Sequence, residues 1–172
     1  MTRPVTFALA AFAVALTSAG AYATRGDAAL ATRGTTDRAS VVAAAGKTVI
    51  QVYKSPTCGC CKNWVDHVRA AGFEAEVFDL SESELQARKT RLGVGPKLAS
   101  CHTAIVNGYV VEGHVPAADI QRMLREKPAI AGIAAPGMPV GSPGMEVPGG
   151  RKDAYDVVAF TRSGTTRVFA RH

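Results

Sequence analysis

The hydrophobic pattern of the first folded stretch predicts a strand, a helix and a second strand. Residues 48–54 are largely apolar and include β-branched side chains, which predicts a strand. Apolar side chains then recur at positions 61, 64, 65, 68 and 71, the spacing of one helical face, so we expect a helix over about 60–71. Gly72 supplies a helix-ending residue. Alternating apolar and acidic residues over 73–80 predict the second strand.

The next segments predict a helix, a hairpin and a further helix. The capping box Ser81-Glu82-Ser83-Glu84 opens a helix with leucines on one face, and Gly93 closes it. Two apolar runs, 103–106 and 109–115, flank Asn-Gly, a dipeptide typical of tight hairpin turns. Pro116 suits the first turn of the helix that follows.

The order of these elements is β-α-β-α-β-β-α, which predicts an α/β thioredoxin-like fold. A parallel crossover followed by a hairpin and a helix is the arrangement of thioredoxin and glutaredoxin, in which helices cover both faces of a small sheet. Residues 131–150 are rich in Gly, Pro and Met, a composition that excludes helix and regular strand. Two apolar runs within 155–170 predict an added hairpin at the sheet edge. The folded domain is therefore expected to span 47–172.

The first residues have the pattern of a cleaved export signal. After a positively charged start, residues 5–16 form an apolar core that is too short to span a bilayer comfortably. Ala21-Tyr22-Ala23 is an A-x-A site, so we expect a signal peptide over 1–23 with cleavage after Ala23. Residues 24–46 lack clear periodicity and are interpreted as a flexible tether. Because no second apolar stretch reaches spanning length, the mature protein is expected to be soluble and free of the membrane. The A-x-A pattern is typical of export to a bacterial periplasm, where disulfides can form.

Composition and charge narrow the classes of function. The 172 residues are enough for one domain with a hydrophobic core, and 47% of them are apolar, which excludes a disordered chain. The formal net charge is +6, but Lys and Arg are scattered and not interleaved with aromatic side chains, so nucleic acid is not an expected partner. The sequence contains no Ser/His/Asp arrangement and no phosphate-binding glycine loop, so no catalytic residue is assigned.

Three of the four cysteines lie within the stretch Cys58-Gly59-Cys60-Cys61, on the predicted turn between strand and helix. Unpaired N–H groups and the positive end of the helix dipole favour a thiolate at such a position. Thiolates are both nucleophiles and soft-metal ligands, so the stretch predicts redox or metal chemistry. In a thioredoxin-like fold the loop before the third strand faces this turn. The fourth cysteine, Cys101, lies in that loop, and we therefore expect a four-thiolate site.

Three classes of function are consistent with this cysteine pattern. A metal-binding protein would use all four thiols. A thiol–disulfide oxidoreductase would use Cys58 as the attacking thiol and Cys61 as the resolving thiol, although Cys60 would then compete for the mixed disulfide. A secreted domain with two structural disulfides is the third class, and it is disfavoured because the loops closed between such near cysteines are tiny.

Histidine and methionine residues supply further candidate ligands. His102 follows Cys101 and is a candidate, although a strand that begins there would point its side chain to the opposite face. His114 falls in the predicted return strand and is interpreted as a surface or core histidine instead. Met138 and Met145 lie in the Gly/Pro loop, and both are secondary candidates because thioethers bind Cu(I). The two methionines therefore favour copper over zinc as the metal bound at the site.

Several motifs together carry a resemblance to a known family. TCGCCKNW at 57–64, SCHT at 100–103, GYVVEGHVP at 108–116, and the Gly-Met-Pro and Pro-Gly-Met-Glu elements resemble the CopG-type periplasmic copper-resistance proteins. This metal-binding family is catalogued as a domain of unknown function, and the resemblance covers about 47–147. It implies a thioredoxin-like fold and cycling between Cu(I) and Cu(II). It also implies copper bound through Cys58, Cys60, Cys61 and Cys101.

These observations lead to one hypothesis. We expect a periplasmic copper-binding protein of metal resistance that holds Cu(I) in the four-cysteine site, as a multinuclear cluster where thiolate sulfurs bridge. Copper ions and other periplasmic copper-handling proteins are the expected partners. The sequence leaves open whether the protein is also an enzyme, a copper oxidoreductase, and a binding protein is favoured.

Overall fold

A computed structural model describes residues 46–172 of the chain. The predicted signal peptide over 1–23 lies outside the described residues, as does the predicted tether over 24–46 except for its last residue. None of the helices in the described part is long and apolar enough to cross a membrane.

The described residues form ten helices and strands, and the first seven follow the order that the hydrophobic pattern predicts. Their bounds differ from the predicted ones by a few residues at most. In chain order the elements are β1 (Val49–Lys54), α1 (Gly59–Ala70), β2 (Glu74–Asp79), α2 (Glu82–Arg91), β3 (Thr103–Val106), β4 (Tyr109–Glu112), α3 (Ala117–Glu126), β5 (Gly132–Ala134), β6 (Asp156–Phe160) and β7 (Thr166–Arg171).

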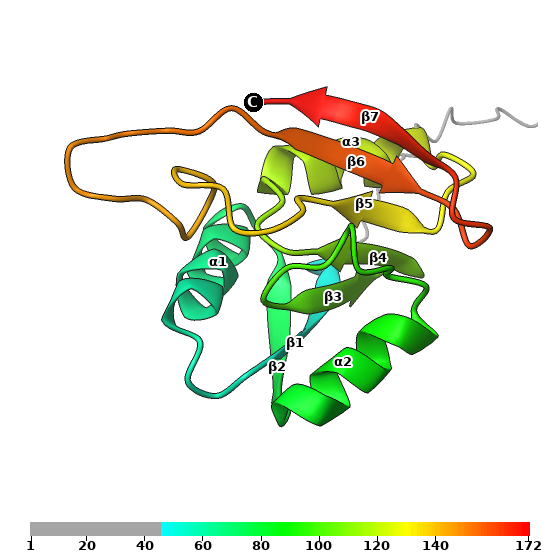
Figure 1. The fold of residues 1–172 in the computed structure, drawn as a ribbon, viewed down its shortest axis with the longest axis horizontal. Coiled ribbons are helices and arrows are strands. Elements are labelled where there is room, and N and C mark those ends of the chain that lie inside the picture. The colour runs from blue at the N-terminus through cyan, green and yellow to red at the C-terminus, as the bar shows by residue number, and fades with distance from the viewer. Residues whose placement is uncertain (1–45) are drawn as a thin grey trace, which may run out of the picture. The chain divides into compact units, whose positions relative to one another are not determined.

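All of these strands belong to one mixed sheet with the order β2-β1-β3-β4-β5-β6-β7 (Figure 1). The β1 strand runs parallel to β2 and antiparallel to β3, and β3 and β4 form the predicted hairpin around Asn107 and Gly108. Because β1 pairs with a strand on each side, its C-terminal end is held in place, and so is the start of the cysteine-bearing turn that follows it. The β3 strand pairs directly with β1, which brings the segment before β3 to the same end of the sheet.

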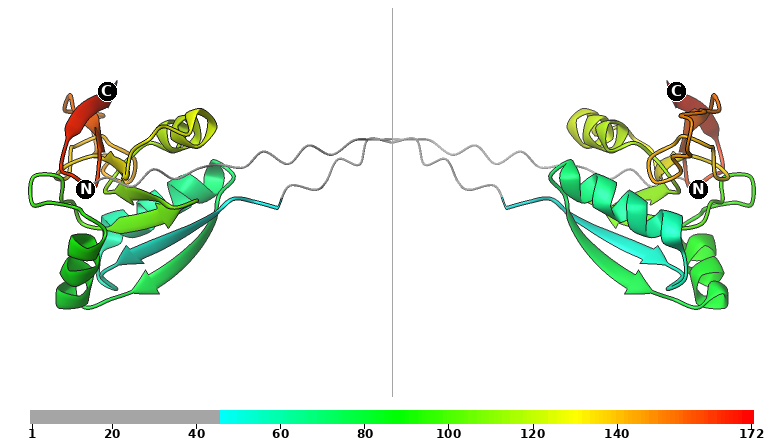
Figure 2. Two further views of the ribbon diagram at one scale, coloured as in Figure 1. Left: turned by 90° about the vertical axis from the view of Figure 1, so that its right-hand side faces the viewer. Right: turned by 90° about the vertical axis from the view of Figure 1, so that its left-hand side faces the viewer.

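Helices cover both faces of the sheet. On one face, α1 and α3 pack over the main core, whose largest members include Trp64, Val68, Ile120, Met123, Ile50 and Ile133. On strand β1 the side chains of Ile50 and Val52 enter that core, so Tyr53 points to the opposite face. There the guanidinium of Arg88 from α2 lies 3.8 Å from the centre of the Tyr53 ring, which places α2 on the second face (Figure 2).

The strand β5 corrects the expectation that 131–150 contains no regular strand. Gly132–Ala134 lies between β4 and β6, parallel to the first and antiparallel to the second. All three residues of β5 are buried. A Cβ at Gly132 would clash with the backbone of Val110, so the glycine that weakens the strand signal is what allows the two strands to approach. The predicted terminal hairpin is confirmed as β6 and β7, with β7 at the sheet edge.

Candidate metal centre

The turn between β1 and α1 presents three cysteines around the first turn of the helix. Cys58 is the N-cap residue, and its sulfur accepts a hydrogen bond from the backbone N–H of Cys61 at 3.3 Å. A sulfur atom therefore takes the place of the oxygen that usually caps a helix. Cys61 is fully buried on the core face of α1, whereas Cys58 and Cys60 are half-buried. The turn thus has one cysteine anchored in the core and two nearer to solvent.

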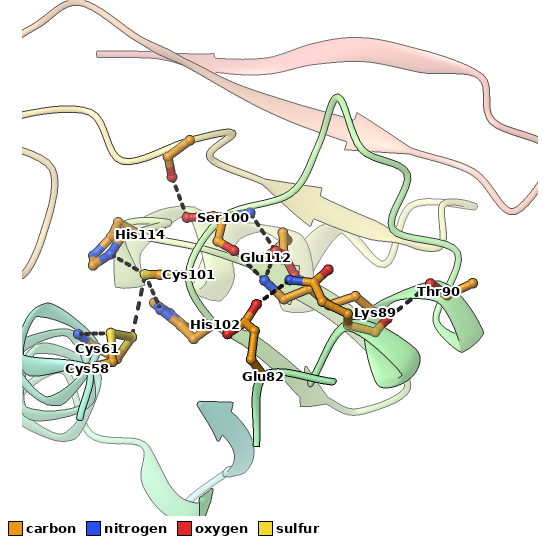
Figure 3. A network of polar contacts seen from close by, with 12 residues as sticks. Cys58, Cys61, Glu82, Lys89, Thr90, Ser100, Cys101, His102, Glu112 and His114 are labelled. Carbon is orange, nitrogen blue, oxygen red and sulfur yellow. Dashed lines mark hydrogen bonds and ion pairs between the residues drawn. A yellow bond between two sulfur atoms is a disulfide. The ribbon is translucent and has the colours of Figure 1, made fainter. Parts of the chain in front are cut away.

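The four sulfur atoms lie close together, as the sequence predicts. Cys58 and Cys61 are joined in a disulfide (Figure 3), and Cys101 lies beside it. Cys60 and Cys101 are free thiols. The Sγ of Cys101 lies 3.4 Å from the Sγ of Cys61 and 3.9 Å from that of Cys60, and Cys60 Sγ is 3.5 Å from Cys58 Sγ. All four sulfurs lie within 4.8 Å of one another. Two segments that are about forty residues apart in sequence thus build one cluster of sulfur donors.

The surroundings of Cys101 make its thiol hard to ionise. Burial, reinforced by the charge of nearby Cys60, raises the pKa of Cys101 to about 12. Without a bound metal ion, the Cys101 thiol therefore keeps its proton at neutral pH. A soft metal ion that binds this sulfur must displace the proton, which makes metal binding depend on pH.

His114 also belongs to the site: it is fully buried, as the interpretation as a core histidine allows, but its contact with Cys101 was not predicted. The Nε2 atom of His114 lies 3.0 Å from Cys101 Sγ, and Nδ1 lies 2.8 Å from the carbonyl oxygen of Pro143. A carbonyl oxygen can only accept, so Nδ1 carries the proton and neutral His114 presents the lone pair of Nε2 to Cys101. This is the form in which an imidazole takes a proton from a thiol or binds a metal.

The position of His114 follows from the early end of β4. The strand stops at Glu112 rather than at residue 115, because Gly113 adopts a φ of 71° and redirects the chain. A Cβ at Gly113 would clash with Ser100, so glycine is also required there for close packing. The Gly-His-Val-Pro sequence, with a glycine at the end of an apolar run, is the signal that could have identified His114.

His102 lies beside the cluster in spite of its place at the start of a strand. It precedes β3, and its Nδ1 atom lies 3.4 Å from Cys101 Sγ. The ring is fully buried between Trp64, at 4.4 Å between ring centres, and His114, at 5.0 Å. Its Nε2 atom is buried without a hydrogen-bond partner. Cys101, His102 and His114 therefore form a second group of donor atoms that shares Cys101 with the sulfur cluster.

We expect acid to destabilise the metal-free protein through His102. Burial lowers the pKa of His102 well below its ordinary value of 6.5. Below about pH 6.5 the unfolded chain therefore takes up a proton that the folded protein does not, and the free energy of unfolding falls by up to about 1.4 kcal/mol per pH unit. Thermal unfolding measured between pH 8 and pH 5 tests this expectation. His102→Phe, which keeps an aromatic ring, should unfold with a weaker acid dependence, and an unchanged slope would contradict the assignment.

The two candidate methionines lie in the loop that follows β5. Met138 is 55% exposed, and Met145 is half-buried beside Gly144. A Cβ at Gly144 would lie 2.7 Å from both the carbonyl oxygen of Cys60 and the backbone nitrogen of Trp64, so only glycine lets the loop rest on the first turn of α1. The loop therefore packs against the cysteine-bearing turn. The sulfur contacts described above include neither thioether, and both methionines stay predicted ligands.

The chemistry of these donors suits a soft, thiophilic cation. The two groups contain four cysteine sulfurs and two imidazoles, without a carboxylate. Thiolate and imidazole ligands select Cu(I), Cu(II) and Zn(II), while Mg²⁺ and Ca²⁺ need oxygen ligands. The Nε2 atom of His102 has no hydrogen-bond partner, and the lone pair of His114 Nε2 faces Cys101 Sγ, so both imidazoles offer a donor atom to a metal ion at this site.

Comparison with known proteins gives matches of two kinds. The family described as "Protein of unknown function, DUF411" matches residues 98–145. Two solved structures of copper resistance protein CopG are similar to the chain over 73% of its length and over 98% of theirs. The form 1 structure is 49% identical with a TM-score of 0.68, and the form 2 structure is 52% identical with a TM-score of 0.66. No protein with curated function matches the chain.

Proposed function

The chain belongs to the CopG-type family of copper resistance proteins, and from this premise we propose that it is a copper-binding protein that holds Cu(I) in its four-cysteine site. The observation that carries the proposal is the gathering of four cysteine sulfurs within 4.8 Å of one another. The ligands would be Cys58, Cys60, Cys61 and Cys101 in the reduced protein.

The geometry around Cys101 extends this proposal to the histidines. Its sulfur is within contact distance of two other cysteine sulfurs and of both imidazoles, so it can bridge metal ions held on either side. Thiolate sulfur bridges soft metals readily, which supports a multinuclear copper cluster with His114 and His102 at its border. Zinc also accepts thiolate and imidazole ligands, but the family and the two methionines of the loop after β5 favour copper.

Fold and location complete the proposal. The strand order β2-β1-β3-β4, with β1 parallel to β2 and antiparallel to β3, supports a thioredoxin-like core that β5, β6 and β7 extend. The predicted signal peptide supports export to the periplasm, where the protein would sequester copper, cycle it between Cu(I) and Cu(II), or transfer it to other copper-handling proteins. Catalysis by a copper oxidoreductase belongs to the same proposal, as redox turnover at this site.

An anaerobic Cu(I) titration of the reduced protein tests the proposed function. Competition with a chromophoric Cu(I) chelator gives the affinity and the number of bound ions together. We expect tight binding that Cys60→Ser weakens strongly, because the variant removes a sulfur 3.5 Å from Cys58 and 3.9 Å from Cys101. A serine oxygen is a hard donor that replaces thiolate poorly for Cu(I). Weak binding by the unmodified protein, or unchanged binding by Cys60→Ser, would contradict the proposal.

The disulfide favours thiol–disulfide exchange as a second candidate function. Cys58 and Cys61 form a C-x-x-C disulfide at a helix N-terminus, the position used by disulfide oxidoreductases. Here Cys60 and Cys101 lie close enough to attack that disulfide internally. Formation of a mixed disulfide with a substrate would therefore compete with attack of Cys60 or Cys101 on the Cys58–Cys61 disulfide. Weak Cu(I) binding by the unmodified protein, together with rapid reduction of a model disulfide that Cys60→Ser leaves unchanged, would favour this second candidate.

A further inference from the structure

Lys89 and Glu112 form a buried ion pair that the proposed copper chemistry does not use. Lys89 lies on α2 and Glu112 at the end of β4, with Nζ 2.9 Å from Oε1. The side chains are only 2% and 0% exposed, whereas in the pair between Lys54 and Asp79 the carboxylate is 54% exposed. Removing two charges from water carries a large desolvation cost, which makes a fully buried pair a poor source of stability. The contacts of the Lys89–Glu112 pair with the backbone indicate another role.

The pair holds both polar backbone groups of a single residue, Ser100. The backbone N–H of Ser100 donates to Oε1 of Glu112 at 2.7 Å, and Nζ of Lys89 donates to the carbonyl oxygen of Ser100 (Figure 3). Bonds with a charged partner are the stronger class of hydrogen bond. The residue held in this way immediately precedes Cys101, which is the sulfur shared by both donor groups.

The two bonds restrict the backbone on the N-terminal side of Cys101. The Ser100 carbonyl belongs to the peptide unit that joins Ser100 to Cys101, so the bond from Lys89 fixes the orientation of that unit. On the C-terminal side, the carbonyl of His102 accepts from Gly113 N–H at 3.0 Å, just before β3 and just after β4. The loop that carries Cys101 is thus held at both ends, and its sulfur has little freedom to leave the cluster.

We propose that the Lys89–Glu112 pair positions Cys101 for metal binding by holding the backbone of Ser100. The role of the pair in copper binding rests on the proposed function, whereas its hold on the Cys101 loop does not. A merely structural pair would contribute to the free energy of unfolding without affecting the placement of this sulfur. A positioning pair must also affect the metal affinity and the accessibility of Cys101 in a protein that remains folded.

The decisive variant is Lys89→Met combined with Glu112→Leu. Replacing both charges with apolar groups of similar size is often neutral for stability, so the fold is expected to survive, but Ser100 loses both partners. Loss of an outer partner of a metal ligand lowers metal affinity by about 10- to 100-fold, and we expect a loss of that size for Cu(I) in the chelator competition. Wild-type affinity in the folded variant would overturn the proposal.

A matched control is Arg122→Met. The guanidinium of Arg122 donates to the backbone carbonyl of Phe169 at 2.6 Å, so this variant also removes a bond from a cationic side chain to a carbonyl. Phe169 lies on β7, which contributes no donor to the site. Arg122→Met should therefore keep wild-type Cu(I) affinity, and an equal loss in this control would overturn the specific role of Lys89 and Glu112.

Two further measurements keep the test decisive if the double variant does not fold. Lys89→Met with Glu112→Gln retains an oxygen that accepts from the Ser100 N–H, so its Cu(I) affinity should lie between those of the wild type and the apolar variant. In the unmodified protein the Ser100 amide hydrogen should exchange slowly with solvent. Wild-type affinity in the folded glutamine variant, or rapid exchange at Ser100, would overturn the proposal.

Alkylation of Cys101 in the metal-free protein separates this inference from the proposed function. Mass spectrometry of the peptide that contains Cys101 gives its alkylation rate without copper. The rate should rise in the double variants and stay unchanged in Arg122→Met, because only the former release the loop. Absence of Cu(I) binding by the unmodified protein would contradict the proposed function but not the hold of the pair on the Cys101 loop. Unchanged alkylation of Cys101 in the folded double variants would overturn that hold.

Discussion

Replacing Cys101 with serine is expected to remove most of the Cu(I) affinity of the reduced protein. Cys101 is shared by the four-sulfur cluster and the group that contains His102 and His114. Its loss takes away the donor that joins the two groups, so the effect should exceed the about 10- to 100-fold that the loss of an outer partner costs. The serine hydroxyl is similar in size but too hard a ligand for Cu(I).

The chelator competition described above measures this loss, with Met123→Leu as the control. Met123 is fully buried in the main core on α3, so that variant removes a sulfur atom without touching the site. It should keep wild-type affinity and stoichiometry. Full copper stoichiometry and affinity in Cys101→Ser would exclude the four-cysteine site as the place where Cu(I) is bound.

Oxidation of the protein is expected to abolish most Cu(I) binding. In the structure Cys58 and Cys61 share a disulfide, which leaves Cys60 and Cys101 as free thiols at 3.9 Å. Two of the four thiolates are then unavailable, and a disulfide sulfur is a far weaker ligand than a thiolate. Reduction adds two electrons and two protons to the disulfide and restores both thiols. The number of Cu(I) ions bound should therefore fall on oxidation and recover on reduction.

Parallel titrations of the oxidised and the reduced protein test the effect of the disulfide. A phosphine reductant is suitable because it leaves no competing thiol. The control is Cys58→Ser combined with Cys61→Ser, which cannot form this disulfide and should bind Cu(I) weakly under both conditions. Equal stoichiometry and affinity of the oxidised and reduced wild-type protein would show that Cys58 and Cys61 are not ligands.

The approach of Cys101 to the cysteine turn could be predicted because it depends on element order alone. Strand periodicity and the Asn-Gly turn identify β1, β3 and β4, and antiparallel pairing of β3 with β1 then brings the loop before β3 to the end of β1. His114 could not be found in this way. Its position depends on the φ of 71° at Gly113, and an apolar run does not reveal where a strand stops hydrogen bonding.

The partners of Ser100 and the strand β5 escaped prediction for different physical reasons. Lys89 and Glu112 are charged residues in a helix and a strand, and periodicity assigns such residues to the surface unless their partner is known. Their mutual distance of 2.9 Å results from the packing of α2 across the sheet. The β5 strand has only three residues and owes its place to pairing with β4 and β6, so no local pattern marks it.

The burial of the cysteine cluster has a consequence for the charge balance of the loaded protein. Four thiolates carry four negative charges, and a single Cu(I) ion would leave most of that charge in a partly buried site. Burial and the charge of Cys60 together raise the pKa of Cys101 to about 12, so the surroundings oppose an unneutralised thiolate. Each further Cu(I) ion cancels one negative charge. Electroneutrality therefore supports the proposed multinuclear cluster, with the number of copper ions approaching the number of thiolates.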